Sequence, residues 1–468
     1  MERLKKIGKV EPKHSLNVKK SKMGLGFEKL DRDVFDPEKA YDKVGELGVK
    51  WIRIQSGWQR TERTPGVYDF SWLDKVVDNL IARGLEPWIC LCYGNDLYDD
   101  LAKKVFGAVG CPPIFTEEQK EAWERYVRTT VEHYKGRVSY FEVWNEPDGI
   151  WCWKTGVNGS ELGAFTRDTG RYIKETNTEA KVIGGVICMR PIAYLNRAFA
   201  AGMGEYIDYV SFHEYTHDES LVFERVTTLR ALCKKYGDID VIQGESGSQS
   251  RSDGAGALRG GAWTPEKQAK QLLRHTVADL MTEVHFTSYF SCMDMIEALN
   301  GTVGDVSTYL DYGYFGVIGA DFDESGRSIG TYTPKPSYYA LQNLASVFAE
   351  DFEVCDLPVI FLPQNSPRYF SSDLPRSQVT VGGFKREGGE LMAYWTPTDL
   401  LRSSTEGSIT FEIYSEYDNV RLIDPMDGSI YEIPEKIMTR DEFGMYRFTN
   451  LIVKDTPLLL EFGNFVKD

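Results

Sequence analysis

The sequence lacks an excess of positive charge. Its 468 residues include 54 Lys and Arg against 70 Asp and Glu, which gives a net charge of −16 at pH 7. Nucleic acids and anionic membrane surfaces are bound through basic patches, so we expect neither as a partner. A neutral substrate such as a sugar is compatible with this charge.

Long apolar runs are also missing. No stretch is long enough to span a bilayer, so we expect no membrane partner. The first ten residues, MERLKKIGKV, are charged and contain no long apolar core, so no signal peptide is expected. These features predict a cytoplasmic protein. They leave open whether it forms a homo-oligomer.

Motifs that hold a cofactor are absent as well. No G-x-G-x-x-G follows the first predicted strand, and His213 and His217 lie near each other without a recognisable zinc-ligand pattern. Several of the eight cysteines lie inside apolar, strand-like runs, which is typical of free buried thiols. Cys90 and Cys92 form a C-x-C pair, but no matching Cys or His pair has suitable spacing. We therefore predict no metal and no organic cofactor.

The sequence does contain eight short apolar runs that alternate with amphipathic helical stretches. The runs are MGLGF (23–27), KWIRIQ (50–55), EPWICLCY (86–93), SYFEVWN (139–145), KVIGGVI (181–187), YVSFH (209–213), DVIQGE (240–245) and HFTSYFS (285–291). Apolar strands that alternate with helices indicate a parallel sheet covered on both faces. Eight such units over about 320 residues predict an α/β fold, a (β/α)₈ TIM barrel spanning 23–349. A doubly wound open sheet is the rival, although it usually has fewer strands.

The pattern changes after about residue 350. Short runs such as SITFEIY (408–414) and PLLLEF (457–462) alternate only partly and are joined by turns, without a helical pattern of useful length. These runs predict a C-terminal antiparallel β-sandwich over 350–468. We expect the N-terminal segment, 1–22, to add a strand to it.

Polar side chains gather where the predicted strands end. In a barrel of this type the functional rim lies at the C-terminal ends of the strands. The rim is thus predicted to carry Arg53, Asn145, Glu146, His213, Tyr215, Glu245, Asp294 and Glu297. Each of these residues alone has a purely structural explanation, since a strand-end Glu or Arg53 often forms a structural ion pair and a lone His is more often a core residue. The combination is what points to chemistry.

Glu146 and Glu245, after the fourth and seventh strands, could face each other across the mouth. Glycoside hydrolysis needs such a pair, with one protonated carboxyl group and one carboxylate. Burial and mutual repulsion are expected to raise the pKa of one, while a cation keeps the other ionised. Arg53 is suited to keep Glu245 charged.

The stretch FEVWNEP (141–147) resembles the acid/base signature of the retaining (β/α)₈-barrel glycosidases of clan A, which include family 39 β-xylosidases and α-L-iduronidases. Its wording is closest to family 39. The resemblance implies that Glu146 is the acid/base, Glu245 the nucleophile and Asn145 the ligand of the sugar 2-hydroxyl. It also implies that His213 and Tyr215 form the H-x-Y of strand six, with Tyr215 touching the nucleophile, and that Arg53 supports the nucleophile.

Two segments depart from the family pattern. Around the nucleophile this chain has QGESGSQS (243–250) where family 39 xylosidases tend to have T-E-F-N-T-S, and it has Tyr289-Phe290 where they usually carry a Trp platform. Phe290, Asp294 and Glu297 are carried over as sugar ligands on this weaker basis. Trp151 offers a flat ring to a sugar, and packing against the fourth helix explains it equally well.

The sequence therefore predicts a retaining glycoside hydrolase, β-xylosidase-like, that cleaves a terminal glycosidic bond of a short oligosaccharide or glycoside. An endo-acting or disaccharide-releasing enzyme of the same clan, with arabinoside, galactoside or glucoside specificity, is the first alternative. A non-catalytic sugar-binding barrel is the second. A barrel aldolase is a third, but no lysine stands at a strand end to form a Schiff base.

Overall fold

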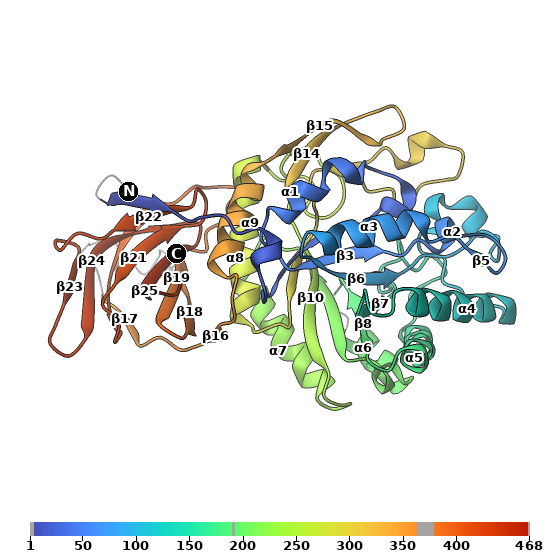
Figure 1. Ribbon diagram of the computed structural model, residues 1–468, viewed down its shortest axis with the longest axis horizontal. Helices are drawn as coiled ribbons and strands as arrows, with labels where there is room; N and C mark the ends of the chain where they lie inside the picture. The colour runs from blue at the N-terminus through green and yellow to red at the C-terminus, as the bar shows by residue number, and fades with distance from the viewer. Residues whose placement is uncertain (1–3, 190–191, 363–378, 467–468) are drawn as a thin grey trace.

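The computed structural model describes residues 4–189, 192–362 and 379–466. Figure 1 shows a helix-rich part beside a part built of strands, with helices α8 and α9 between them. Within the described ranges, no helix has both the length and the apolarity needed to cross a bilayer. All eight cysteines are free thiols, as expected, and six of them are buried.

Eight parallel strands close into a barrel, in which each strand pairs with its neighbours in chain order and the last pairs with the first. The predicted TIM barrel is confirmed, and the doubly wound open sheet is excluded. The strands are β2 (Met23–Gly26), β3 (Trp51–Gln55), β6 (Glu86–Leu91), β7 (Tyr140–Val143), β8 (Lys181–Ile187), β9 (Tyr209–Glu214), β10 (Asp240–Ser246) and β11 (Thr287–Tyr289).

Helices cover the outside of the barrel, and each buries an apolar face against the strands. In α4, the Thr116 side chain caps the first turn together with Gln119, and Trp123, Tyr126 and Val127 are buried on one face. The helices are α1 (Tyr41–Gly45), α2 (Trp58–Thr61), α3 (Ser71–Ala82), α4 (Glu117–His133), α5 (Gly159–Thr176), α6 (Ile192–Ala200), α7 (Leu221–Cys233), α8 (Pro265–Met281) and α9 (Pro336–Val347).

Alternation along the strands sorts side chains between the helices and the barrel interior. In β3, Ile52 and Ile54 join the core beneath the helices, while Trp51, Arg53 and Gln55 share the opposite face. Trp51 stacks on Phe286 with ring centroids 4.4 Å apart, so aromatic rings fill the end of the barrel where the strands begin. The charged side chains therefore lie between this aromatic plug and the mouth.

The C-terminal part consists of antiparallel sheets, as predicted. A seven-stranded sheet runs β1 (Lys5–Lys9), β22 (Ser429–Glu432), β21 (Val420–Asp424), β25 (Leu458–Gly463), β19 (Gly389–Trp395), β18 (Thr380–Arg386) and β16 (Glu353–Val354). A four-stranded sheet runs β17 (Val359–Phe361), β20 (Glu406–Tyr414), β24 (Met445–Lys454) and β23 (Met438–Arg440). Strand β1, from the N-terminal segment, pairs antiparallel with β22.

Three small hairpins complete the fold, namely β4 (Glu62–Thr64) with β5 (Val67–Tyr68), β12 (Met295–Ile296) with β13 (Tyr312–Gly313), and β14 (Ile318–Phe322) with β15 (Ser328–Pro334). Buried polar contacts join α8 to the strand-rich part. Lys270 lies 3.0 Å from Asp455, and Glu219 accepts hydrogen bonds from Arg274 at 2.7 Å and from the Trp395 indole at 2.7 Å. These contacts attach the C-terminal sheets to the side of the barrel at α8 and the loop between β9 and α7.

Candidate active site

Asn145 and Glu146 follow β7 after Trp144, and His213 and Glu245 lie on β9 and β10. The structure brings these side chains together with Arg53 of β3 at the mouth of the barrel. The Glu146 and Glu245 side chains keep 12% and 9% of their surface exposed, whereas those of Arg53 and His213 are wholly buried. The two carboxyl groups are therefore the exposed tips of a buried polar layer.

The end of β7 turns sharply to present Asn145 and Glu146. Trp144 and Glu146 both have positive φ angles, 68° and 43°, which residues other than glycine rarely adopt. The Trp144 indole fixes the turn, because it is buried and donates a hydrogen bond to the Cys152 carbonyl at 2.7 Å. Strained backbone of this kind persists where the surroundings over-determine it, often at functional sites.

A register shift in β10 aims Glu245 into the mouth. Gln243 pairs with Phe212, and the next paired residue is Glu245, opposite His213, so Gly244 is the extra residue of a bulge. A β-carbon on Gly244 would press on Ser211 Oγ and lie 3.1 Å from His213 Nε2. Glycine thus lets the two strands approach while the bulge re-aims the next side chain.

Arg53 is the centre of the buried layer. Its Nε donates to Glu142 Oε1 at 2.9 Å, and its Nη2 donates to Asn145 Oδ1 at 2.8 Å. Its Nη1 donates to Glu245 Oε1. The guanidinium therefore orients both Asn145 and Glu245.

Each oxygen of the two carboxyl groups has a donor or a histidine nitrogen beside it. The Tyr215 hydroxyl donates to Glu245 Oε2 at 2.6 Å. Glu146 Oε1 lies 3.0 Å from His213 Nδ1, and Glu146 Oε2 accepts from the Trp151 indole at 2.6 Å. His213 Nδ1 is also 3.6 Å from Glu245 Oε2, so the histidine lies between the two carboxyl groups.

The expectation that the acid carries a raised pKa is wrong for this arrangement. Burial pushes the pKa of Glu146 upward, but hydrogen bonds from His213 and Trp151 outweigh it and lower the pKa below its usual value. Burial lowers the pKa of His213, yet Glu245 and Glu146 together raise it above the usual value. The site therefore favours the ionised form of Glu146 and the protonated form of its neighbour His213.

One ligand atom each from Glu146, His213 and Glu245 lie within 4.8 Å of one another, a spacing at which a metal ion could be held. The donors around them argue against that use. Arg53 and Tyr215 direct N–H and O–H groups at Glu245, and Trp151 directs an N–H at Glu146. Protons aimed at the same oxygens oppose a cation, so the set suits proton transfer better than metal ligation.

The remaining predicted residues fall into two places. Glu297 lies 3.3 Å from Lys29 Nζ, which stands 5.1 Å above the Phe290 ring, beside the carboxyl pair. Asp294 instead binds Lys335 Nζ at 2.6 Å and the Gly316 amide at 3.0 Å, so the structure does not bring it to that pair.

Sequence reasoning missed Glu28, Lys29, Gln55 and Glu142, which are buried around the same layer. Glu142 was hidden inside an apolar run, although its place two residues after Tyr140 puts it on the inward face. Glu28 and Lys29 follow the first strand, and that position at the rim was the signal available.

Trp153, two residues after Trp151, packs fully buried against Trp144 and Phe165, so its ring is not available as a platform for a sugar.

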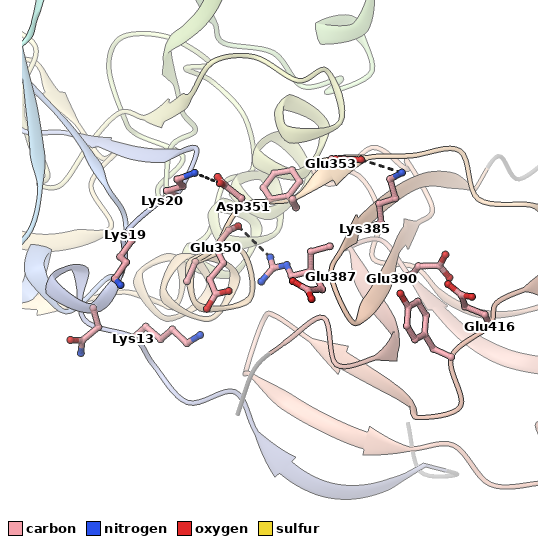
Figure 2. A pocket seen from close by; sticks show the side chains of 15 residues that line it. Lys13, Lys19, Lys20, Glu350, Asp351, Glu353, Lys385, Glu387, Glu390 and Glu416 are labelled. Carbon is pink, nitrogen blue, oxygen red and sulfur yellow. Dashed lines mark hydrogen bonds and ion pairs between the residues drawn. The ribbon is translucent and has the colours of Figure 1, made fainter.

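A separate cavity, of about 1020 Å³, lies between the N-terminal segment, the end of α9 and the C-terminal sheets. Figure 2 shows Lys19, Lys20 and Asp351 on one side of it and Lys385, Glu387 and Glu416 on the other. Its charges form exposed pairs, such as Lys385 with Glu353 at 3.1 Å. Exposed pairs of this kind contribute little energy, and none of the rim residues lines this cavity.

Comparisons with known sequences relate part of the chain to glycoside hydrolases. Residues 40–242 match the model of glycosyl hydrolases family 39. A β-xylosidase of Geobacillus stearothermophilus is 28% identical over 156 residues, which cover 32% of this chain and 31% of that protein. A 6-phospho-β-glucosidase of Clostridium longisporum is 30% identical over 133 residues, which cover 25% and 26% respectively. The chain thus spans less than a third of the length of these curated relatives.

Solved structures resemble the whole chain. A family 39 glycoside hydrolase of Bacteroides cellulosilyticus WH2 aligns with a TM-score of 0.63 and 18% identity, over 94% of this chain and 80% of that one. A monomeric β-xylosidase of Caulobacter crescentus CB15 aligns with a TM-score of 0.58 and 14% identity, over 99% and 98%. At these identities the likeness shows a shared fold.

The fold is a (β/α)₈ barrel that resembles the solved family 39 glycoside hydrolase of Bacteroides cellulosilyticus WH2. The resemblance to family 39 that FEVWNEP indicated is confirmed by the family match over residues 40–242.

Proposed function

We propose that this protein is a retaining glycosidase that releases a terminal sugar, in the manner of a β-xylosidase, from a short oligosaccharide or glycoside. Glu245 is the nucleophile and Glu146 the acid/base. Asn145, His213, Tyr215 and Arg53 set their positions and charges, and Trp151, Phe290 and Glu297 are assigned to the sugar-binding surroundings.

The observation that carries the proposal is the short spacing of the two carboxyl groups. An oxygen of Glu146 and an oxygen of Glu245 lie within 4.8 Å of each other. Retaining enzymes hold their two carboxyl groups about 5–5.5 Å apart, whereas inverting enzymes leave about 6.5–9.5 Å for a water molecule. Oxygens this close, with His213 Nδ1 3.0 Å from one carboxyl group and 3.6 Å from the other, favour attack by Glu245 itself on the anomeric carbon.

In the first step, a Glu245 oxygen forms a bond to the anomeric carbon while the glycosidic bond breaks. The departing oxygen takes a proton from Glu146, and the products are the free alcohol and a glycosyl ester of Glu245. The 3.0 Å contact between Glu146 Oε1 and His213 Nδ1 keeps a proton next to the acid. Tyr215 and Arg53 hold the attacking carboxylate through both of its oxygens.

In the second step, Glu146, now a carboxylate, removes a proton from water, and the resulting oxygen displaces Glu245 from the sugar. Two inversions at one carbon leave the original anomeric configuration. Carboxyl groups run both steps, so the proposal includes no metal or organic cofactor.

A panel of aryl glycosides tests the proposal and the sugar together. It should include β-xyloside, α-arabinoside, β-galactoside, β-glucoside and 6-phospho-β-glucoside, because the two curated relatives are a β-xylosidase and a 6-phospho-β-glucosidase. We expect turnover of the pentosides, and proton NMR of the first-formed sugar should show the configuration of the substrate.

The same panel separates the alternatives. Turnover of a hexoside with none on the pentosides would replace the xylosidase-like specificity. Cleavage restricted to longer oligosaccharides, with release of disaccharides, would indicate the endo-acting or disaccharide-releasing alternative. Sugar binding without any turnover would indicate the non-catalytic barrel, and an inverted product would exclude the covalent role of Glu245.

A further inference from the structure

Glu28 is a buried carboxyl group at the bottom of the site that neither step uses. It follows β2, and its side chain is 1% exposed. Its carboxyl group folds back over Gly26, where a β-carbon would overlap one oxygen and lie 2.7 Å from the other. The glycine therefore leaves room for this carboxyl group beneath the mouth.

Glu28 and Glu245 meet the same nitrogen of Arg53. Glu28 Oε1 lies 3.4 Å from Arg53 Nη1, and that Nη1 donates to Glu245 Oε1. Glu142 occupies Nε and Nη2 from the other side. Among the described residues, Glu28 Oε2 has no hydrogen-bond partner. Three buried carboxyl groups thus surround one guanidinium, and Glu28 is the one that it contacts most weakly.

A second cation near Glu28, Lys29, lowers its pKa less than Arg53 does. Lys29 is bound to Glu297 at 3.3 Å and to the Ile296 carbonyl at 3.1 Å. Glu245 adds negative charge from β10, and the Cys292 thiol lies on the side of β11. A buried carboxylate without its own partner is costly, so such a group takes up a proton instead.

The electrostatics agree with this geometry. Burial is the main effect and raises the pKa of Glu28 to about 8, against the opposing charge of Arg53 and with the help of Glu245.

We propose that Glu28 is a positioning residue that stays protonated near neutral pH, and that its neutral form leaves the Arg53 Nη1 group to orient Glu245. When Glu28 ionises at higher pH, it competes with Glu245 for that donor, and the nucleophile loses its alignment. This inference rests on the proposed function, because it assigns Glu28 a role at the same site.

The test is the pH dependence of kcat/KM on a dinitrophenyl glycoside of the best sugar from the panel. This leaving group departs without a proton, so the protonation of Glu146 does not limit the rate. We expect kcat/KM of the wild type to fall above about pH 8, where Glu28 ionises.

Glu28→Gln mimics the neutral acid and cannot ionise, so its profile should stay level to at least about one pH unit higher. Glu28→Ala should lower kcat/KM at pH 6 about tenfold, and Glu28→Gln should restore most of that loss. Asp279→Asn is the matched control. It removes another buried acid whose pKa is raised, to about 6, but which lies outside the mouth, so the alkaline fall should remain.

A second readout needs no activity. Because the pKa of Glu28 is raised from 4.5 to about 8, folding becomes less favourable as pH rises through that window. The Tm of Glu28→Gln minus that of the wild type should therefore grow between these values and then level off. If the wild type cleaves no glycoside but this Tm difference appears, the result contradicts the proposed function and still supports a protonated Glu28 near neutral pH.

An unchanged alkaline fall in Glu28→Gln would overturn the inference. So would a loss of 100-fold or more at pH 6 in a folded Glu28→Gln, because the anion would then be the working form.

Discussion

Removing the Glu146 side chain should separate the two carboxyl groups by role. General-acid catalysis is worth about 10²–10⁴ in rate, so Glu146→Ala should lose that factor on a natural glycoside. On a dinitrophenyl glycoside the first step should be nearly unaffected. The second step should slow, since no base activates water, and the glycosyl ester should accumulate. Added azide should then restore turnover and give a glycosyl azide with the configuration of the substrate.

The structure also sets the cost of this change to the site. The Ala variant leaves the Trp151 indole and His213 without the acceptor that they share, at 2.6 Å and 3.0 Å. An unpaired buried donor costs about 1–3 kcal/mol, so Glu146→Ala should unfold at a lower temperature than the wild type. Glu146→Gln keeps an acceptor oxygen, so its Tm should lie closer to the wild type although it too lacks the acid.

The matched variant is Glu245→Ala, which removes the attacking group. It should fail on both substrates, and azide should rescue it only with the opposite anomer, by direct attack. The assay is initial rate on both glycosides with and without azide, with NMR of the azide product. Equal losses for both variants on both substrates, or azide products of swapped configuration, would refute the assignment.

Three further predictions concern single contacts. Tyr215→Phe keeps the ring against Phe315 but removes a 2.6 Å hydrogen bond to the Glu245 carboxyl group. A hydrogen bond to a charged group is worth about 1.5–3 kcal/mol, so kcat/KM should fall about 10–100-fold. A fall of less than threefold would contradict this prediction. Gly244→Ala should lower kcat at least about tenfold with its circular dichroism spectrum unchanged, because the new methyl group pushes on the His213 ring. Asp279→Asn should add about 3 kcal/mol to the free energy of unfolding at pH 8 but only about 1 kcal/mol at pH 4.5, because burial raises the pKa of Asp279 from 3.8 to about 6 and the cost of ionising it builds up between these two values. Urea unfolding at the two pH values measures the last effect, and a gain independent of pH would contradict it.

The barrel was predictable because each strand is a continuous apolar run and each helix carries one apolar face. The candidate catalytic pair followed from the rule that strand ends converge at one rim, and FEVWNEP strengthened it. The bulge at Gly244 was not predictable, since a register shift depends on the facing strand and not on local composition. The lowered pKa of Glu146 depends on a 3.0 Å contact with a residue 67 positions away, which no local pattern contains.

Glu28 and Glu142 illustrate another limit of the sequence. A charged residue inside or beside an apolar run is ordinarily a sign of solvent exposure, yet both are buried against Arg53. Their burial is acceptable only because β2, β3 and β7 bring Glu28, Arg53 and Glu142 to the same point, and that convergence exists only in the closed barrel.

The pairing of β1 with β22 has a consequence for the order in which the chain folds. Lys5 and Glu432, which face each other across this pair, are 427 positions apart, so the strand that a ribosome makes early finds its partner only when most of the chain has emerged. Contacts between such distant residues form slowly, because a long loop must close first. Until then β1 is an unpaired strand, and the lysines at positions 5, 6 and 9 give it the charge that discourages pairing with the wrong edge. This ladder therefore joins a segment that precedes the barrel to one that follows it, and a nascent chain stalled before residue 429 should leave β1 open to proteases while its barrel is already protected.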